Sequence, residues 1–207
     1  WRHDVVDEAD LVEEGLRING FDNIPSVPLS LNTAIPSGAL NRSQEQRALA
    51  RRVLATRGMT EAVTFSFLPT KYADLFGGVS KALKLVNPIS SDLSTMRPSL
   101  LPNLISAIRK NADRGTNDSA LFELGPQFLG ETPSDQVMAV SGVRVGKTGP
   151  RNWAETPRSL DVFDVKADVM DLLLKIGVSV SSTKVATETP KWYHPGRSGS
   201  VQLGPKT

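Results

Sequence analysis

The segment Leu100-Leu-Pro-Asn-Leu-Ile-Ser-Ala-Ile-Arg-Lys-Asn-Ala-Asp-Arg-Gly115 decides the fold, together with Leu121-Phe-Glu-Leu-Gly125 just after it. Apolar residues at helical spacing predict one buried stripe in the first segment: Leu101, Leu104, Ile105 and Ile108. Pro102 suits a first helical turn, and Gly115 suits the end of the helix. In the second segment apolar residues alternate with others, so the period changes from 3.6 to 2. We therefore predict an amphipathic helix that leads into a short buried strand.

The composition is that of an ordinary folded protein. The chain has 207 residues, of which 39% are hydrophobic and 22% charged, enough for one large domain or for one domain plus a fragment. No apolar run approaches the ~18 residues that a membrane span needs, so we expect no membrane partner. The absence of cysteine excludes disulfides and thiolate metal sites, and it fits the cytoplasmic location that we predict. Because Trp1 stands in place of Met, we also expect a fragment of a longer protein.

Hydrophobic periodicity predicts interleaved helices and strands along the rest of the chain. We expect longer helices over 7–19, 43–57 and 165–176, and strands over 1–6, 62–67 and 137–145. Ser43 and Gln46 have the spacing of a capping box, and a short helix should run from Pro69-Thr70 to Gly77-Gly78. The strand over 62–67 would carry on one face Val63, Phe65 and Phe67. Because the strands look half-exposed, we predict an α+β fold with a mixed, mostly antiparallel sheet flanked by helices.

A proline-rich stretch divides the chain. Residues 23–38 contain three prolines and little periodicity, which is typical of an extended linker. We place a domain boundary near residue 30. Residues 1–30 would then form a strand, a helix and the linker, and residues 31–207 the main domain.

Three motifs in one order resemble the β subunit of bacterial phenylalanyl-tRNA synthetase. They are an Asn87-Pro-Ile-Ser90 turn, the Leu-Leu-Pro helix ending in Asn111-Ala-Asp-Arg-Gly115, and the Leu121-Phe-Glu-Leu-Gly125 strand. Two further segments are similar to the family: Trp153 with Asp161-Val-Phe-Asp-Val-Lys-Ala-Asp168, and Tyr193-His-Pro-Gly-Arg-Ser-Gly199. The resemblance implies a class II aminoacyl-tRNA synthetase-like antiparallel sheet with helices, preceded by the end of a helix-turn-helix-like (winged) module. One departure is Asn19-Gly20-Phe21, where the family usually has Tyr-Gly-Tyr.

The family resemblance also shows which chemistry is missing. A working class II site uses an arginine in a Phe-Arg-x-Glu strand and a second one later, since the planar guanidinium fork suits phosphate oxygens. This chain contains no Arg-x-Glu sequence, and the matching strand reads Phe122-Glu-Leu-Gly-Pro-Gln127. We therefore predict no catalytic residues and no cofactor-binding residues here. The resemblance implies an inactive core that packs against the catalytic α subunit in an (αβ)2 heterotetramer, which ligates phenylalanine to tRNA(Phe) with ATP bound only at the α subunit.

Four acidic residues near the start of the chain have site-like spacing. Asp10, Glu13 and Glu14 stand at i, i+3 and i+4 of the predicted helix, so their carboxylates share a face. Carboxylate oxygens suit Mg²⁺, and the family's subunit-shared magnesium site implies that Asp4, Asp10, Glu13 and Glu14 are its ligands. The alternative is that these residues complement the helix dipole and solvate an exposed face.

Two other functions stay open. The first is a tRNA- or DNA-binding module, suggested by the pI near 9.0 and the opening helix, although the net charge is only +2. Against it, no aromatic stacking set accompanies the basic residues of the predicted helices. The second is a self-sufficient class II ligase, which the missing arginines argue against. His3 and His194 lack a neighbouring acid or serine pattern and are interpreted as exposed or turn residues.

Overall fold

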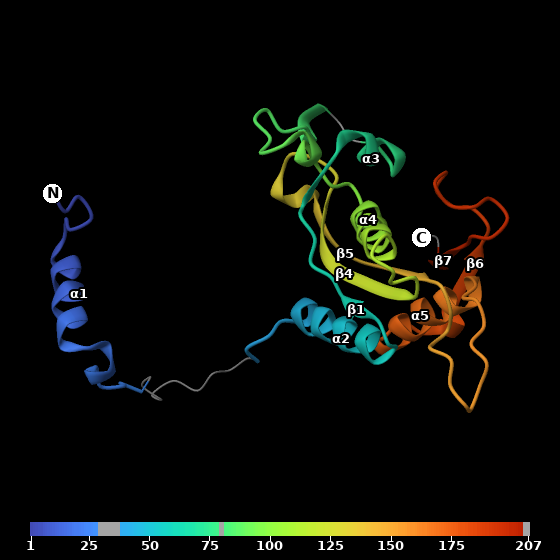
Figure 1. Ribbon diagram of the computed structural model, residues 1–207, viewed down its shortest axis with the longest axis horizontal. Helices are drawn as coiled ribbons and strands as arrows, with labels where there is room; N and C mark the ends of the chain where they lie inside the picture. Colours follow the sequence, from blue (N-terminus) through green and yellow to red (C-terminus); the bar gives the residue numbers. More distant parts are fainter. Residues whose placement is uncertain (29–37, 79–80, 205–207) are drawn as a thin grey trace. The chain divides into compact units, whose positions relative to one another are not determined.

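The computed structural model describes residues 1–28, 38–78 and 81–204, drawn in colour in Figure 1. The chain divides into two compact units, Trp1–Ala39 and Leu40–Thr207. The predicted boundary near residue 30 and most of the predicted linker lie outside the described residues.

The first unit contains helix α1 (Glu8–Asn19) and a 3-10 turn, η1 (Phe21–Asn23). Asp7 is the N-cap residue, and the Asp10 carboxylate accepts the backbone N–H groups of Val6 and Asp7, each at 2.8 Å. The predicted strand over residues 1–6 is wrong. This segment forms a turn, in which the Val5 N–H group donates to the Arg2 carbonyl. A strand needs a partner for its backbone groups, and the described residues of this unit supply none.

The second unit holds the remaining elements. Its helices are α2 (Arg42–Thr56), α3 (Thr70–Leu75), α4 (Leu101–Ala112) and α5 (Val162–Lys175). Its 3-10 turns are η2 (Lys81–Leu83), η3 (Ser91–Leu93), η4 (Pro133–Asp135) and η5 (Val180–Ser182). Its strands are β1 (Thr60–Glu61), β2 (Phe67–Leu68), β3 (Thr95–Met96), β4 (Ser119–Phe128), β5 (Gln136–Val145), β6 (Thr183–Ala186) and β7 (Ser200–Leu203).

The largest sheet has the strand order β1-β4-β5. β4 and β5 are antiparallel along their whole length, from Ser119 opposite Val145 to Phe128 opposite Gln136. β1 runs parallel to β4, and two small antiparallel sheets, β2–β3 and β6–β7, complete the pairing among the described strands. The predicted α+β class is therefore confirmed.

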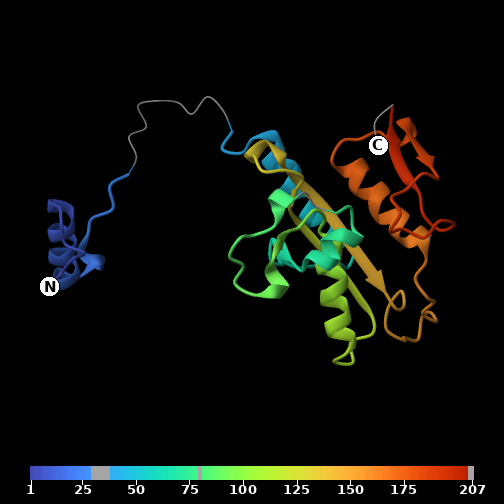
Figure 2. The ribbon, with the colours of Figure 1, turned by 90° about the horizontal axis from the view of Figure 1, so that it is seen from above.

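Helices lie on both faces of this sheet. α4 lies over one face of β4 and β5, while α2 and α5 lie together on the other (Figure 1). The core centres on Phe122, which is 1% exposed and packs with Leu54 and Met59. On the α4 side Leu100 and Leu104 are fully buried, whereas Ile105 remains 45% exposed. Figure 2 shows α5 and the β6–β7 hairpin together at one end of the unit.

Most predicted elements of the second unit are present, with two corrections. Asn41 and Gln44 form the capping box of α2 in place of Ser43 and Gln46. Oδ1 of Asn41 accepts the Gln44 N–H group at 2.9 Å, and Oε1 of Gln44 accepts the Asn41 N–H group at 2.8 Å. The helix begins earlier than predicted, and Asn is as good an N-cap as Ser. Of the strand predicted over 62–67, only Phe67 lies in a strand, β2, while β1 ends at Glu61 just before the predicted segment.

Candidate functional site

A buried ion pair lies beside the middle of β4. The side chains of Arg97 and Glu123 are 2% and 3% exposed, and Nη1 of Arg97 donates to Oε1 of Glu123 at 2.7 Å. The second carboxylate oxygen accepts the hydroxyl of Thr64 at 2.7 Å, and Nε of Arg97 donates to the Pro126 carbonyl at 2.9 Å. A buried charge is tolerated only when it is paired and hydrogen-bonded, and both charges here meet that condition.

Gly125 gives this arginine its space. A Cβ atom at position 125 would lie 2.5 Å from Nη2 of Arg97, closer than any side chain could stand. The glycine that ends the Leu121-Phe-Glu-Leu-Gly125 motif therefore has a steric role. The guanidinium is fixed on acceptors of the protein itself and is not available to a phosphate group.

The segment over residues 62–66 covers the ion pair and turns its apolar side chains outward. Its backbone is fixed by the Ala62 N–H group, which donates to the Phe122 carbonyl at 2.7 Å, and by Nδ2 of Asn103, which donates to the Phe65 carbonyl at 2.7 Å. The alternation predicted from the sequence is present, but Val63 and Phe65 are 91% and 70% exposed. Two adjacent outward apolar groups on a fixed backbone form a ready contact surface.

This segment borders a groove of about 900 Å³ that also involves α3, η3 and α4. Its lining residues are Val63, Thr64, Phe65, Phe67, Leu68, Pro69, Lys71, Tyr72, Asp92, Leu93, Asn103, Ser106, Ala107, Arg109, Lys110 and Asp113. Arg109 is the only arginine among these described lining residues. The positive charges of Arg109, Lys71 and Lys110 are partly offset by Asp92 and Asp113. The groove therefore lacks the pair of arginines that a class II site places on phosphate oxygens.

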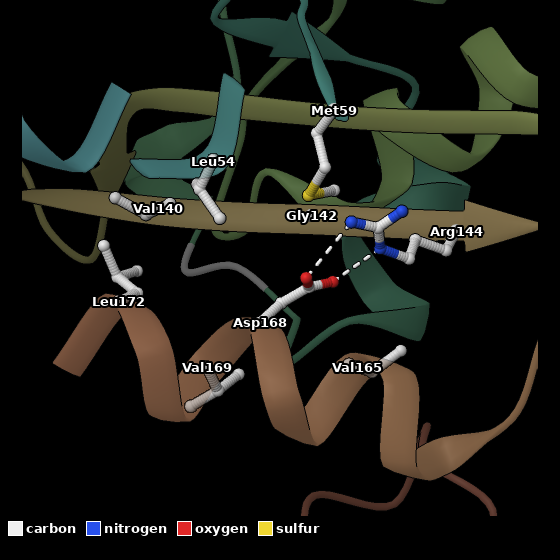
Figure 3. Close-up of a pocket in the computed structure, with 9 residues that line it drawn as sticks. All are labelled: Leu54, Met59, Val140, Gly142, Arg144, Val165, Asp168, Val169 and Leu172. Carbon is white, nitrogen blue, oxygen red and sulfur yellow. Dashed lines mark hydrogen bonds and ion pairs between the residues drawn. The ribbon is translucent and has the colours of Figure 1, made fainter. Parts of the chain in front are cut away.

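A second ionic cluster joins α5 to β5 and to the end of α2. Figure 3 shows its contact between Asp168 and Arg144. Asp168, 6% exposed, accepts Nε of Arg144 at 2.6 Å and also Nε of Arg57. Nη2 of Arg144 additionally donates to the Arg57 carbonyl at 2.7 Å. The hydrogen bond that Arg57 donates to the Asp168 carboxylate raises the pKa of Arg57. Asp168 closes the Asp161–Asp168 motif, and its role here is to hold α5 in place.

A cavity of about 90 Å³ lies beside this cluster, between β5, α5 and the end of α2. Its walls are mainly apolar: Leu54, Met59, Val140, Gly142, Val165, Val169 and Leu172, with Arg144 and Asp168 at one end (Figure 3). Both ionisable groups at that end are already paired with each other, so the cavity presents no free charge to a ligand.

Three of the four predicted magnesium ligands have other partners in the first unit, and the fourth, Glu13, is exposed. Asp4 and Glu14 both accept Nη2 of Arg2, each at 2.7 Å, and Glu14 also accepts Arg17 at 2.7 Å. These two arginines lower the pKa of Glu14 to about 2, with Arg2 the larger cause. Asp10 is occupied with the N-terminus of α1.

The arrangement of these carboxylates does not fit a cation within this chain alone. In the described ranges, no group of three or more His, Cys, Asp or Glu side chains has the arrangement needed to hold a metal ion. A cation would have to replace Arg2, which already compensates the charges of Asp4 and Glu14. The assignment of magnesium to Asp4, Asp10, Glu13 and Glu14 therefore stays a prediction.

Comparisons with known proteins place this α+β domain among the aminoacyl-tRNA synthetases. Residues 24–207 match the family model for the phenylalanyl tRNA synthetase beta chain CLM domain, and the chain belongs to that family, as its motifs predicted. It is 50% identical over 206 residues to the phenylalanine–tRNA ligase beta subunit of Paramagnetospirillum magneticum, covering all of this chain and 26% of that protein. It is 48% identical over 204 residues to the same subunit of Rhodospirillum rubrum, covering 99% of this chain and 25% of that protein.

The chain thus spans about a quarter of the length of these relatives. Among solved structures, the pyrrolysyl tRNA synthetase PylSc of Desulfitobacterium hafniense matches with a TM-score of 0.48 and 14% identity, over 70% of this chain and 48% of that one. None of the helices within the described ranges is both long enough and apolar enough to cross a membrane.

Proposed function

We propose that this chain is the non-catalytic structural core of a phenylalanyl-tRNA synthetase β subunit. In this proposal it has a class II synthetase-like fold and packs against the catalytic α subunit in an (αβ)2 holoenzyme, which ligates phenylalanine to tRNA(Phe) with ATP. The observation that carries the proposal is the burial of Arg97. The guanidinium beside the central strand donates to Glu123 and Pro126, so it cannot stabilise charge on a phosphate.

The contact surface for the α subunit in this proposal is the outward face of residues 62–66. Val63 and Phe65 supply large apolar groups, and their backbone is already fixed, so docking costs little ordering entropy. Large apolar anchors that fill a partner's pockets carry most of the free energy of a typical interface.

A pull-down tests the proposed contact. The chain is mixed with a bacterial phenylalanine–tRNA ligase α subunit, and the wild type is compared with Val63→Ser/Phe65→Ser. We expect the wild type to associate and the double variant to bind at least about 10-fold more weakly. The matched control is Val86→Ser/Ile89→Ser, since these residues are 100% and 91% exposed but do not line the groove. Failure of the wild type to associate, or equal loss in the control, would remove the proposed interface.

Phenylalanine-dependent pyrophosphate exchange separates the structural role from a self-sufficient ligase. We expect no exchange by the chain alone, because its central arginine is fixed in an ion pair. Exchange above background by the purified chain would contradict the non-catalytic role directly.

A further inference from the structure

A charged residue, and no apolar one, anchors α5 to the sheet. Of the 14 residues of α5 only Asp168 is buried, and its carboxylate accepts Nε of Arg144 on β5 at 2.6 Å. The helix also packs against α2. An ordinary helix on a sheet instead buries an apolar stripe against the strands that it covers. The apolar stripe of α5 is therefore incompletely packed.

This packing leaves the cavity of about 90 Å³ beside β5 (Figure 3). Val165, Val169 and Leu172 stand at i, i+4 and i+7 of α5, so they share one face, and all three line the cavity. Val165 and Val169 remain 44% and 38% exposed. The cavity therefore opens to solvent, and a small molecule can enter it without unfolding the domain.

The opposite wall is made by small side chains of β5 and by the residue just before β1. Val140 and Gly142 lie on one face of β5, and a Cβ atom at position 142 would lie 2.9 Å from Cε of Met59. Glycine thus makes room for the Met59 side chain, which also packs in the core with Phe122. Because the flexible Met59 side chain lines the cavity, its methyl group should respond to a molecule that enters.

The lining favours an uncharged apolar molecule. A buried water needs about two to four polar partners, and the apolar walls offer none, so water is displaced from them easily. Arg144 and Asp168 are already paired, so an amino acid would bury its ammonium and carboxylate groups without partners. An engineered apolar cavity of roughly 150 Å³ in another protein binds benzene or xenon. A cavity of about 90 Å³ therefore suits xenon or a saturated hydrocarbon of about five carbon atoms.

We propose that this cavity is a binding site for small uncharged apolar molecules of that size. The ligand supplies the apolar contacts that α5 lacks, so it holds α5 more firmly against β5. The residues that line this cavity and those that line the larger groove beside residues 62–66 have no member in common. The proposal therefore does not depend on the contact with the α subunit.

NMR of methyl-labelled methionine tests the proposal on the whole chain. The chain has four methionines, of which only Met59 lines the cavity, and Met96 on β3 serves as the internal reference. The probes are xenon dissolved under pressure and cyclopentane. We expect each to shift the Met59 methyl resonance in a saturable way and to leave Met96 unchanged, whereas phenylalanine should shift neither. Amide hydrogen exchange in α5 should also slow when either probe is present.

Substitutions then locate the site. Val169→Phe places a ring in the cavity, and we expect it to abolish the Met59 shift. The matched control is Val162→Phe, the same change on α5 at a residue that is 45% exposed and does not line the cavity, and it should respond as the wild type does. Leu172→Ala enlarges the cavity and should favour cyclohexane over cyclopentane. Circular dichroism checks the fold of each variant, and Leu172→Ala alone carries the test if Val169→Phe does not fold.

Four outcomes would overturn the proposal. They are no Met59 shift with either probe, an equal shift of Met59 and Met96, loss of the shift in Val162→Phe as well, and a Met59 shift caused by the α subunit but by neither probe. The variant Val63→Ser/Phe65→Ser should bind both probes normally, so failure of the α subunit contact and failure of this proposal give different results.

Discussion

Replacing Glu123 by Gln should destabilise the second unit strongly. The amide keeps the shape of the side chain but removes the negative charge that faces the guanidinium of Arg97 at 2.7 Å, where both side chains are almost fully buried. Both carboxylate oxygens accept donors, from Arg97 and Thr64, whereas Gln offers only one oxygen. One donor must therefore face an NH2 group, and one cation is left buried without a counter-charge.

Breaking a buried ion pair from one side costs about 3–5 kcal/mol, and we expect about 3 kcal/mol here because the Pro126 carbonyl still accepts from Arg97. For a domain of this size the melting temperature falls about 2–4 °C per kcal/mol, so the expected decrease is about 6–12 °C. Thermal unfolding followed by circular dichroism measures the shift. Urea unfolding should show a lower midpoint with an unchanged slope.

Two companion variants decide whether the ion pair is the cause. Arg97→Met/Glu123→Leu removes both charges and should lose less stability than Glu123→Gln, leaving mainly an unpaired Pro126 carbonyl that costs about 1–3 kcal/mol. Gly125→Ala leaves both charges in place but puts a methyl group against the guanidinium, and should cost about 1–3 kcal/mol. The ion pair is not the cause if Glu123→Gln lowers the free energy of unfolding by less than about 1 kcal/mol. The same holds if Arg97→Met/Glu123→Leu lowers the free energy of unfolding more than Glu123→Gln does.

The other ionic clusters give two further expectations. Asp168→Asn should lower the free energy of unfolding by about 2–3 kcal/mol, since Arg144 loses its counter-charge and Arg57 keeps only its longer contact with Asp171, at 3.5 Å. An unchanged midpoint in denaturant unfolding would contradict this. Glu14 should titrate near 2 instead of 4.5, because Arg2 and Arg17 bind its charged form. Its stabilising contribution is therefore complete above about pH 4.5 and is lost as the pH falls toward 2. An NMR titration of the Glu14 carboxyl with a midpoint near 4.5 would show that these ion pairs are absent in solution.

The sequence by itself determined the elements with long, regular periodicity. The helix over Leu101–Ala112, the part of β4 around Leu121–Gly125 and the strand over Gln136–Val145 follow from regular apolar spacing. β4 is longer than the short strand that was predicted, since it runs from Ser119 to Phe128. Their ends are set by local signals, such as Pro102 in the first turn and Gly115 at φ 93° after the helix. The family also followed from the sequence, because its motifs are contiguous.

Only the tertiary structure decided what those elements face. Alternation places Glu123 opposite Phe122 and Leu124 along the strand, yet it cannot show that Arg97, from another segment, will bury that carboxylate. The same limit applies to Val63 and Phe65, whose alternation is real but whose face is open to solvent. Trp192 meets Phe76 across a separation that no local pattern spans. Periodicity records which residues share a face, and the partner of that face is fixed only when distant segments pack together.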